Sequence, residues 1–303
     1  MRKQFSIGAA FVALVLGAPG ASIAQSKSKP ARPSPLAIVE AVQMPAWFER
    51  SGARYPLTPG VELKDRDQVM TGANSRLLLR MADGSSVKLG ENGSLSFEGM
   101  RMRGDNVFEA AMKVAEGAFR FTSDFFARFR GRREVRVTVR TVAAGIRGTD
   151  LWGKSTPDRQ ILCLIEGKID VTPPGESPIG MDQRLSFYVR EGGQSQPVAI
   201  VLADQLREWA GETETQAGRG VSKRGGKWKL TASPGLAPNR ALDLYRDLRN
   251  AGYPAEIIPA KVGNKRVYNV RLSNFETRRD AEFVASALKQ HPGLRQHEYK
   301  VGT

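Results

Sequence analysis

The stretch RTVAAGIRGTDLW (Arg140–Trp152) decides the fold of the N-terminal part of the chain. A basic, β-branched run, EVRVTVRT (Glu134–Thr141), leads into it, and its valines alternate with arginine and threonine. Because successive side chains of a strand point to opposite faces, this period of two predicts a half-buried strand. Small residues follow, where the backbone is expected to pass close to another group. The segment RGT (Arg147–Thr149) is then expected to turn the chain into a second apolar strand at Leu151–Trp152.

The RGT segment contains no catalytic nucleophile, metal ligand or phosphate-binding loop. We interpret Arg147, Gly148 and Thr149 as a tight turn in which the threonine hydroxyl satisfies local backbone groups. The alternative is a recognition surface at Arg147.

Short apolar runs separated by turn residues continue on both sides of this stretch. Asp83–Gly84 supplies the positive φ of a tight hairpin turn between two apolar runs. Asn106–Phe121 is expected to form two strands divided at Glu116–Gly117, and residues 159–173 a hairpin that turns at Glu166–Gly167. About ten such strands indicate an all-β sandwich or a short β-solenoid over residues 36–210.

A short amphipathic helix is expected to close this β-rich part. In the sequence ADQLREWAG and the leucine before it, Leu202, Leu206 and Trp209 lie three to four residues apart. That spacing places them on one helical face.

Two segments of this part resemble the FecR-type periplasmic domain. They are VRTVAAGIRGTDLWG (Val139–Gly153) and the upstream DQVMTGANSRLLLRMADGSSVKLGENGSL (Asp67–Leu95), in the order and at the spacing of that family. The resemblance covers about residues 61–173. It implies a β-rich periplasmic domain that binds an envelope protein and has no catalytic residues.

The N-terminus has the pattern of a cleaved export signal. A positive start precedes an apolar run from Phe5 to Leu16, and Ser22–Ala24 is a small-x-small cleavage site. We predict a signal peptide over residues 1–24, cleavage after Ala24 and a periplasmic mature protein. Residues 25–35, polar and rich in proline, are expected to be a disordered linker. The apolar run is too short to remain as a membrane anchor.

Composition indicates an anionic partner. The chain of 303 residues has a formal net charge of +15 and room for two domains. Such a charge favours nucleic acid, lipid headgroups or cell-wall polymer, although a basic protein without such a partner remains the alternative. Export makes nucleic acid the weakest of these. The single cysteine, Cys163, cannot form an intramolecular disulfide and is expected to be a small buried residue.

The pattern changes in the C-terminal part. Residues 211–226, rich in glycine and nearly free of apolar side chains, are expected to be a flexible linker. From Lys227, strands alternate with helices at Ala237–Gly252 and from Thr277, which with Asp280 has the spacing of a capping box. The order βαββαβ predicts an α+β, ferredoxin-like domain over residues 227–303, with both helices on one face of an antiparallel sheet.

This C-terminal part resembles the SPOR domain. The matching residues are YNVRLSNFETRRDAEFVASALK (Tyr268–Lys289) and the two strand–helix half-repeats. Ser273–Asn274 replace the family's usual Gly-Pro, and Ser233–Pro234 replace its usual Gly-x-Phe. The resemblance implies binding to septal peptidoglycan, at glycan strands stripped of peptide, on the bare face of the sheet.

The period of two assigns the residues of that face. Lys229, Thr231, Asn269 and Arg271 are expected to form a polar patch that can bond sugar hydroxyls and carboxylates. Tyr268 alternates with the inward set but begins its strand, so we include it, with Tyr299 as an alternative, as a ring to stack on a sugar. The alternative is that these residues only solvate an exposed sheet. Residues 227–303 carry 14 basic and 7 acidic side chains, which suits a partner with carboxylates.

Little in the sequence indicates an enzyme or a cofactor. The two histidines, His291 and His297, lie close together without a carboxylate or cysteine at ligand spacing, so we expect no metal site. Phosphate-loop and dinucleotide fingerprints are absent. The segment SDFFARFRGRR (Ser123–Arg133) interleaves phenylalanine with arginine; we favour a loop docked on the β-rich part over a nucleic-acid stacking surface.

The sequence therefore predicts a non-enzymatic periplasmic protein that binds peptidoglycan glycan strands through the SPOR-like domain and an envelope protein through the β-rich domain. A signalling partner that senses the state of the envelope is the alternative. A wall-active enzyme is a third hypothesis.

Overall fold

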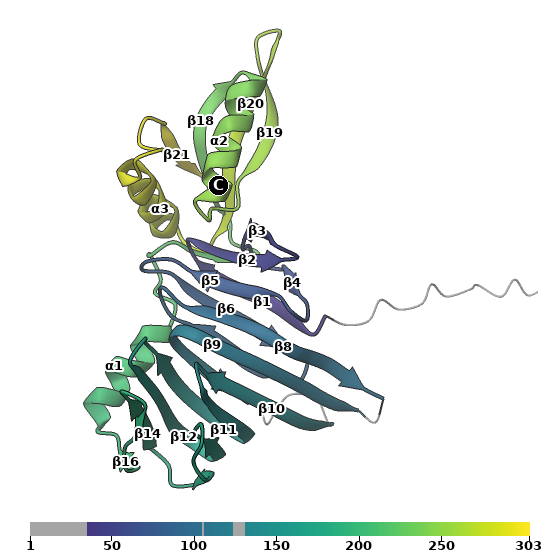
Figure 1. Ribbon diagram of the computed structural model, residues 1–303. Coiled ribbons are helices and arrows are strands. Elements are labelled where there is room, and N and C mark those ends of the chain that lie inside the picture. The colour runs from purple at the N-terminus through teal and green to yellow at the C-terminus, as the bar shows by residue number, and fades with distance from the viewer. Residues whose placement is uncertain (1–34, 105, 124–130) are drawn as a thin grey trace, which may run out of the picture. The chain divides into compact units, whose positions relative to one another are not determined.

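The protein, seen in a computed structural model, is described over residues 35–104, 106–123 and 131–303 (Figure 1). The predicted signal peptide and all but Pro35 of the predicted N-terminal linker lie outside these residues, as do residues 124–130 of the basic aromatic segment. None of the helices in the described ranges is both long and apolar enough to cross a membrane.

The N-terminal part is almost entirely β-structure, which confirms the expected all-β class. Its strands are β1 (Ala37–Gln43), β2 (Ala46–Arg50), β3 (Ala53–Pro56), β4 (Glu62–Leu63), β5 (Gln68–Thr71), β6 (Arg76–Met81), β7 (Ser86–Leu89), β8 (Ser94–Arg103), β9 (Val107–Thr122), β10 (Arg132–Val139), β11 (Val142–Ser155), β12 (Arg159–Thr172), β13 (Ile179–Met181), β14 (Ser186–Glu191), β15 (Gln194–Ser195), β16 (Ala199–Ile200) and β17 (Val221–Lys223). We call residues 36–223 the β-rich domain.

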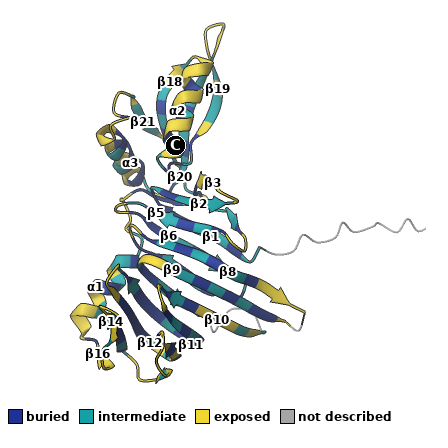
Figure 2. Ribbon diagram, viewed as in Figure 1, coloured by how far each residue is buried: buried dark blue, intermediate teal, exposed yellow. Residues whose placement is uncertain are grey.

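The long strands β9, β11 and β12 each belong to two layers. The first half of β9 pairs with β8 and β10, and its second half pairs with β7 and β11. Inward residues of both layers share one core cluster, and burial alternates along the strands (Figure 2). Pairing is antiparallel everywhere in this domain except between β9 and β10, which differs from the parallel coils of a β-solenoid.

Three glycines mark where these strands pass from one layer to the other. Gly117, Gly148 and Gly167 all have positive φ, at +87°, +55° and +99°. The predictions of two strands around Gly117, a turn at RGT and a hairpin at Gly167 were therefore wrong in one respect. In each place the strand continues, with a bulge or a change of partner instead of a reversal. Glycine is the usual residue for a positive φ both in a turn and in a bulge, so the sequence alone does not distinguish the two.

The helix α1 (Ala203–Thr213) covers a second, smaller cluster on the outer side of one layer. The Trp209 ring stacks on Trp152 with centroids 4.7 Å apart, and its edge meets Phe187. Leu202, expected on the same face, precedes the helix and is 74% exposed.

The C-terminal part contains β18 (Trp228–Leu236), α2 (Pro238–Asn250), β19 (Glu256–Val262), β20 (Lys265–Phe275), α3 (Arg278–Gln290) and β21 (Tyr299–Gly302), in the expected βαββαβ order. Antiparallel pairing gives the strand order β21–β18–β20–β19. Leu230 and Leu272 pack with buried residues of α2 and α3, so both helices cover the same face. Thr277 and Asp280 form the predicted capping box.

The predicted flexible linker at 211–226 is ordered. It contains the end of α1 and the strand β17, whose Val221–Lys223 pair with Ala41–Gln43 of β1. The prediction failed because the order comes mainly from backbone hydrogen bonds and glycine conformations, which leave few apolar side chains in the sequence.

Candidate functional site

The face of the C-terminal sheet opposite the helices carries a transverse row of polar side chains. Thr231 of β18 lies directly beside Arg271 of β20 and Lys300 of β21, and Arg271 lies beside Glu256 of β19. Directly paired residues of antiparallel strands point to the same side. The row therefore places two cations, a hydroxyl and one carboxylate side by side on this half-exposed face.

Arg271 is the residue of this row with the most unused bonding capacity. Its guanidinium is 3.9 Å from the Glu256 carboxylate, and its Nε is buried without a hydrogen-bond partner. The Oγ of Ser273, two residues further along β20, is likewise buried without a partner. Unsatisfied buried polar groups are costly, so a hydrogen bond from each of these two atoms to an ordered water is expected.

Lys229 lies beside Gly302 at the end of the same face. Asn269 has a different duty, because its Oδ1 accepts a hydrogen bond from the Gly235 backbone N–H at 2.9 Å. That bond closes a bulge of β18 in which Ser233 and Gly235 both have positive φ. Asn269 therefore shapes the loop next to the face and keeps only its amide N–H groups for a ligand.

The two departures from the SPOR pattern lie at backbone irregularities. Asn274 has φ +67°, a conformation that asparagine tolerates better than most residues after glycine. Ser233 has φ +45°, and its hydroxyl lies 3.0 Å from Nδ1 of His297, whose pKa is lowered by burial. Ser233 thus adopts a positive φ where the family usually has glycine, whereas Asn274 stands where the family usually has proline, a residue that cannot adopt φ +67°.

Tyr268 does not belong to the polar row. Its ring packs against the apolar core, as does the ring of Tyr299, whose hydroxyl donates to the Leu294 carbonyl at 2.8 Å. The structure places both rings on the helix side, because the alternation of β20 continues unbroken back to Tyr268. Both rings therefore lie with the inward residues and outside the polar row, and the stacking of Tyr268 on a sugar stays a prediction.

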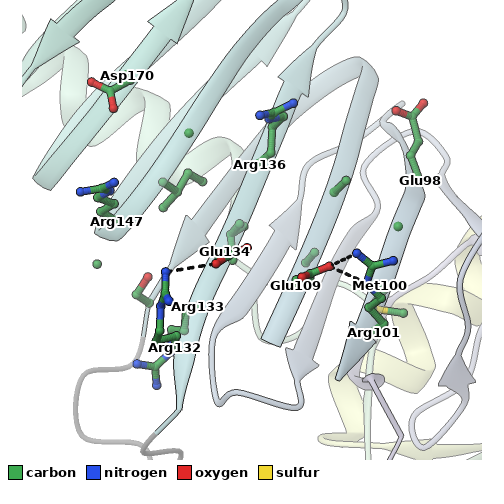
Figure 3. Close-up of a pocket in the computed structure, with 18 of the residues that line it drawn as sticks. Glu98, Met100, Arg101, Glu109, Arg132, Arg133, Glu134, Arg136, Arg147 and Asp170 are labelled. Atoms are coloured by element: carbon green, nitrogen blue, oxygen red, sulfur yellow. Dashed lines mark hydrogen bonds and ion pairs between the residues drawn. The ribbon is translucent and has the colours of Figure 1, made fainter. Parts of the chain in front are cut away.

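A polar groove of about 1130 Å³ crosses the β-rich domain over β8, β9, β10 and β11 (Figure 3). Its charged lining residues are Asp65, Glu98, Arg101, Glu109, Arg132, Arg133, Glu134, Arg136, Arg147 and Asp170. Several already form ion pairs, including Arg132 with Glu134 at 3.3 Å and Arg103, beside the groove, with Glu109 at 2.7 Å. Arg136 and Arg147 are exposed and have no ion-pair partner among the described residues.

Two residues of the RGT segment, Arg147 and Thr149, have different roles. Thr149 is 1% exposed, and its hydroxyl donates at 3.0 Å to the Arg147 carbonyl or at 2.9 Å to that of Lys168. This confirms the expected local backbone role of the hydroxyl. Arg147 projects into the groove, as the alternative interpretation had it (Figure 3). The sequence indicated Arg136 only as an outward residue of a strand, because the groove joins strands far apart in the chain.

Other candidate chemistry is structural. Cys163 is fully buried beside the tryptophans, and burial raises the pKa of its thiol to about 12. Over the described residues, no group of three or more His, Cys, Asp and Glu side chains could hold a metal ion.

Two family models match parts of this chain. The family model "FecR protein" matches residues 67–170, and the model "SPOR domain" matches residues 224–294. The chain matches no curated protein sequence. Two crystal structures of a "putative anti-sigma factor" from Parabacteroides distasonis, at 1.65 and 2.50 Å resolution, are each 16% identical with a TM-score of 0.39. The match covers 75% of this chain and 92% and 91% of theirs. The chain thus contains a FecR domain at residues 67–170 and a SPOR domain at residues 224–294.

Proposed function

We propose that this is a non-enzymatic periplasmic protein, exported by a signal peptide over residues 1–24 and held at septal peptidoglycan by its SPOR domain. A SPOR domain implies peptidoglycan binding, and both matched families are non-catalytic binding or regulatory domains of the cell envelope. The observation that carries the proposal is the polar row of β18, β20 and β21, with its under-bonded Arg271.

The chemistry of a peptide-stripped glycan fits this row. Removal of the stem peptide leaves a lactyl carboxylate on each muramic acid, and the sugars present hydroxyls and N-acetyl groups. A guanidinium donates two parallel hydrogen bonds to a carboxylate, and a charge-assisted bond is stronger than a neutral one. Lys300 and Lys229 add positive charge on the same face, while Thr231 can bond a hydroxyl.

Co-sedimentation of the mature chain with purified sacculi, before and after amidase treatment, tests the proposal. We expect stronger binding after amidase, and loss of that gain in the double variant Lys229→Ala, Arg271→Ala. The matched control is Arg246→Ala, Lys289→Ala, which removes the same charge from exposed helical positions of the same domain. Binding that ignores the amidase and disappears in both double variants at moderate salt would leave only charge attraction and refute the proposal.

We also propose the β-rich domain as the protein-interaction module, with an envelope protein as its partner. The support is the FecR match and the groove, where the Arg136 and Arg147 guanidinium groups have no ion-pair partner within the described ranges. A photo-crosslinking residue at Gly145, between these arginines, would capture a defined envelope protein in cells, and Arg136→Glu with Arg147→Glu would abolish that product. A crosslink of unchanged yield in the charge-reversed chain would contradict this assignment of the surface.

A further inference from the structure

The segment between the two domains is bonded to both of them. Ser222 of β17 pairs with Val42 of β1 on one side and with Phe275 of β20 on the other. The backbone N–H of Met44 also donates to the Gly220 carbonyl at 3.1 Å. One short strand is therefore shared by the sheet of the β-rich domain and the sheet of the SPOR domain.

Asp280 ties this strand to the first turn of α3. One carboxylate oxygen accepts from the Gly220 and Val221 backbone N–H groups at 3.0 and 2.9 Å. The other accepts from the backbone N–H of Thr277 at 3.0 Å, in the capping box. Asp280 is fully buried. A single carboxylate thus caps the SPOR helix and holds the backbone at the start of β17.

Side chains of α3 close over the same segment. The Arg219 guanidinium lies 5.7 Å from the Phe283 ring centroid, and a Cβ built at Gly220 would lie 2.9 Å from the Val284 side chain.

The start of the segment is bonded to the β-rich domain. Gln216 donates its backbone N–H to the buried Gln43 side chain at 2.8 Å. Glu214 pairs with Lys88 of β7 and Arg120 of β9.

A second contact joins the domains elsewhere. The Trp47 indole N–H of β2 donates to the Asn250 carbonyl at the end of α2, at 3.2 Å. A Cβ at Gly252 would lie 2.6 Å from the same indole ring, and φ at Gly252 is +86°. The backbone N–H of Ala46 donates to the Gly252 carbonyl at 3.4 Å.

We infer that residues 214–223 are a rigid splint that fixes the SPOR domain to the β-rich domain. The two domains then move together as one rigid body and are not joined by a flexible linker. A SPOR domain fixed to the wall then holds the β-rich domain in a set orientation. This inference rests on the contacts of residues 214–223 and does not depend on the proposed glycan site.

Limited trypsin digestion of the mature chain, read by mass spectrometry, tests the splint. The segment contains Arg219 and Lys223, followed by Arg224, which a flexible linker would expose to rapid cutting. We expect cleavage there to be at least about tenfold slower in the wild type than in Asp280→Ala, because protection follows the population of the open form. Asp243→Ala, an exposed position in α2, is the control and should digest like the wild type.

Amide hydrogen exchange of the wild type decides the question even if Asp280→Ala does not fold. Amides of Gln216 and of residues 219–222, which are hydrogen-bonded or paired, should exchange at least about a hundredfold more slowly than in a free peptide. Exchange at the free-peptide rate, or early cleavage at Arg219 in the wild type, would overturn the inference. Either result is independent of whether the chain binds sacculi.

Discussion

Replacing Gly167 with alanine tests the close backbone contact between β12 and β11, at the point where β12 changes partners. A Cβ at this position would overlap the Gly148 carbonyl oxygen and would lie 2.8 Å from the Thr149 Cα. Both are backbone atoms of the neighbouring strand, so β11 and β12 must separate there. The separation also strains the Thr149 hydroxyl bond to the Lys168 carbonyl, which is 2.9 Å long.

The expected cost has three parts. A side chain at positive φ costs about 1–2 kcal/mol. Forcing a methyl group into a closed contact costs about 1–3 kcal/mol. The weakened hydrogen bond adds about 1 kcal/mol. Together these give about 3–6 kcal/mol for Gly167→Ala.

Gly175→Ala is the matched control. Gly175 also has positive φ, at +72°, but a Cβ there meets nothing within 4 Å. It should therefore show only the conformational cost, about 1–2 kcal/mol. The entropy lost from the unfolded chain, about 0.4–1 kcal/mol in favour of alanine, applies equally to both variants and cancels.

Urea unfolding followed by tryptophan fluorescence measures the two free energies, since the Trp152–Trp209 pair reports on this domain. We expect Gly167→Ala to be less stable than Gly175→Ala by about 2–4 kcal/mol. Equal stability of the two variants would refute the claim that close backbone contact requires glycine at residue 167.

Three further predictions concern single side chains. Trp209→Ala should cost about 3–5 kcal/mol in urea unfolding, because a buried stacked ring is lost, whereas Leu202→Ala, at a 74% exposed position, should change stability by less than about 0.5 kcal/mol. Cys163 should resist alkylation at pH 8 until the protein unfolds, because with a pKa of about 12 roughly one thiol in ten thousand is ionised; labelling of the native protein at the rate of a free thiol would contradict its burial. The lowered pKa of His297 means that the unfolded chain binds the proton more readily, so stability should fall as the pH falls from about 6.5 through the folded pKa. Thermal unfolding between pH 7.5 and 5 should show a smaller decline in His297→Gln, and an unchanged decline would assign it to other groups.

The sequence predicts the elements well where one alternation continues within one environment. Val135, Val137 and Val139 are all buried, as their spacing indicated, and the βαββαβ order with its Thr277–Asp280 capping box is present. It fails where a strand changes partners, as at Gly148 and Gly167, because a glycine with positive φ fits a reversal and a bulge equally well.

The candidate site divides in the same way. The period of two correctly assigns Thr231 and Arg271 to the outer face of the sheet. The residues before and after each of them along its strand are buried, and alternate side chains of a strand point to opposite faces. It could not find Lys300 or Glu256 as their neighbours, since strand order is a tertiary property. It also gave no sign that Asn269 bonds the Gly235 backbone. The period of two predicted that Tyr268 points inward, and its ring does pack against the core.

The family boundary and the structural boundary of the SPOR domain differ, and the difference affects any binding experiment. The family match begins at residue 224, yet the first turn of α3 shares Asp280 with the backbone N–H groups of Gly220 and Val221. A fragment that begins at Lys227 would leave that carboxylate buried with half of its partners missing, and an unsatisfied buried acceptor costs about 1–3 kcal/mol. It would also expose the edge of β20 at Phe275, which β17 pairs in the whole chain. Weak glycan binding by such a fragment would therefore measure a damaged domain, so recognition of the wall has to be tested on a chain that keeps residues 220–223.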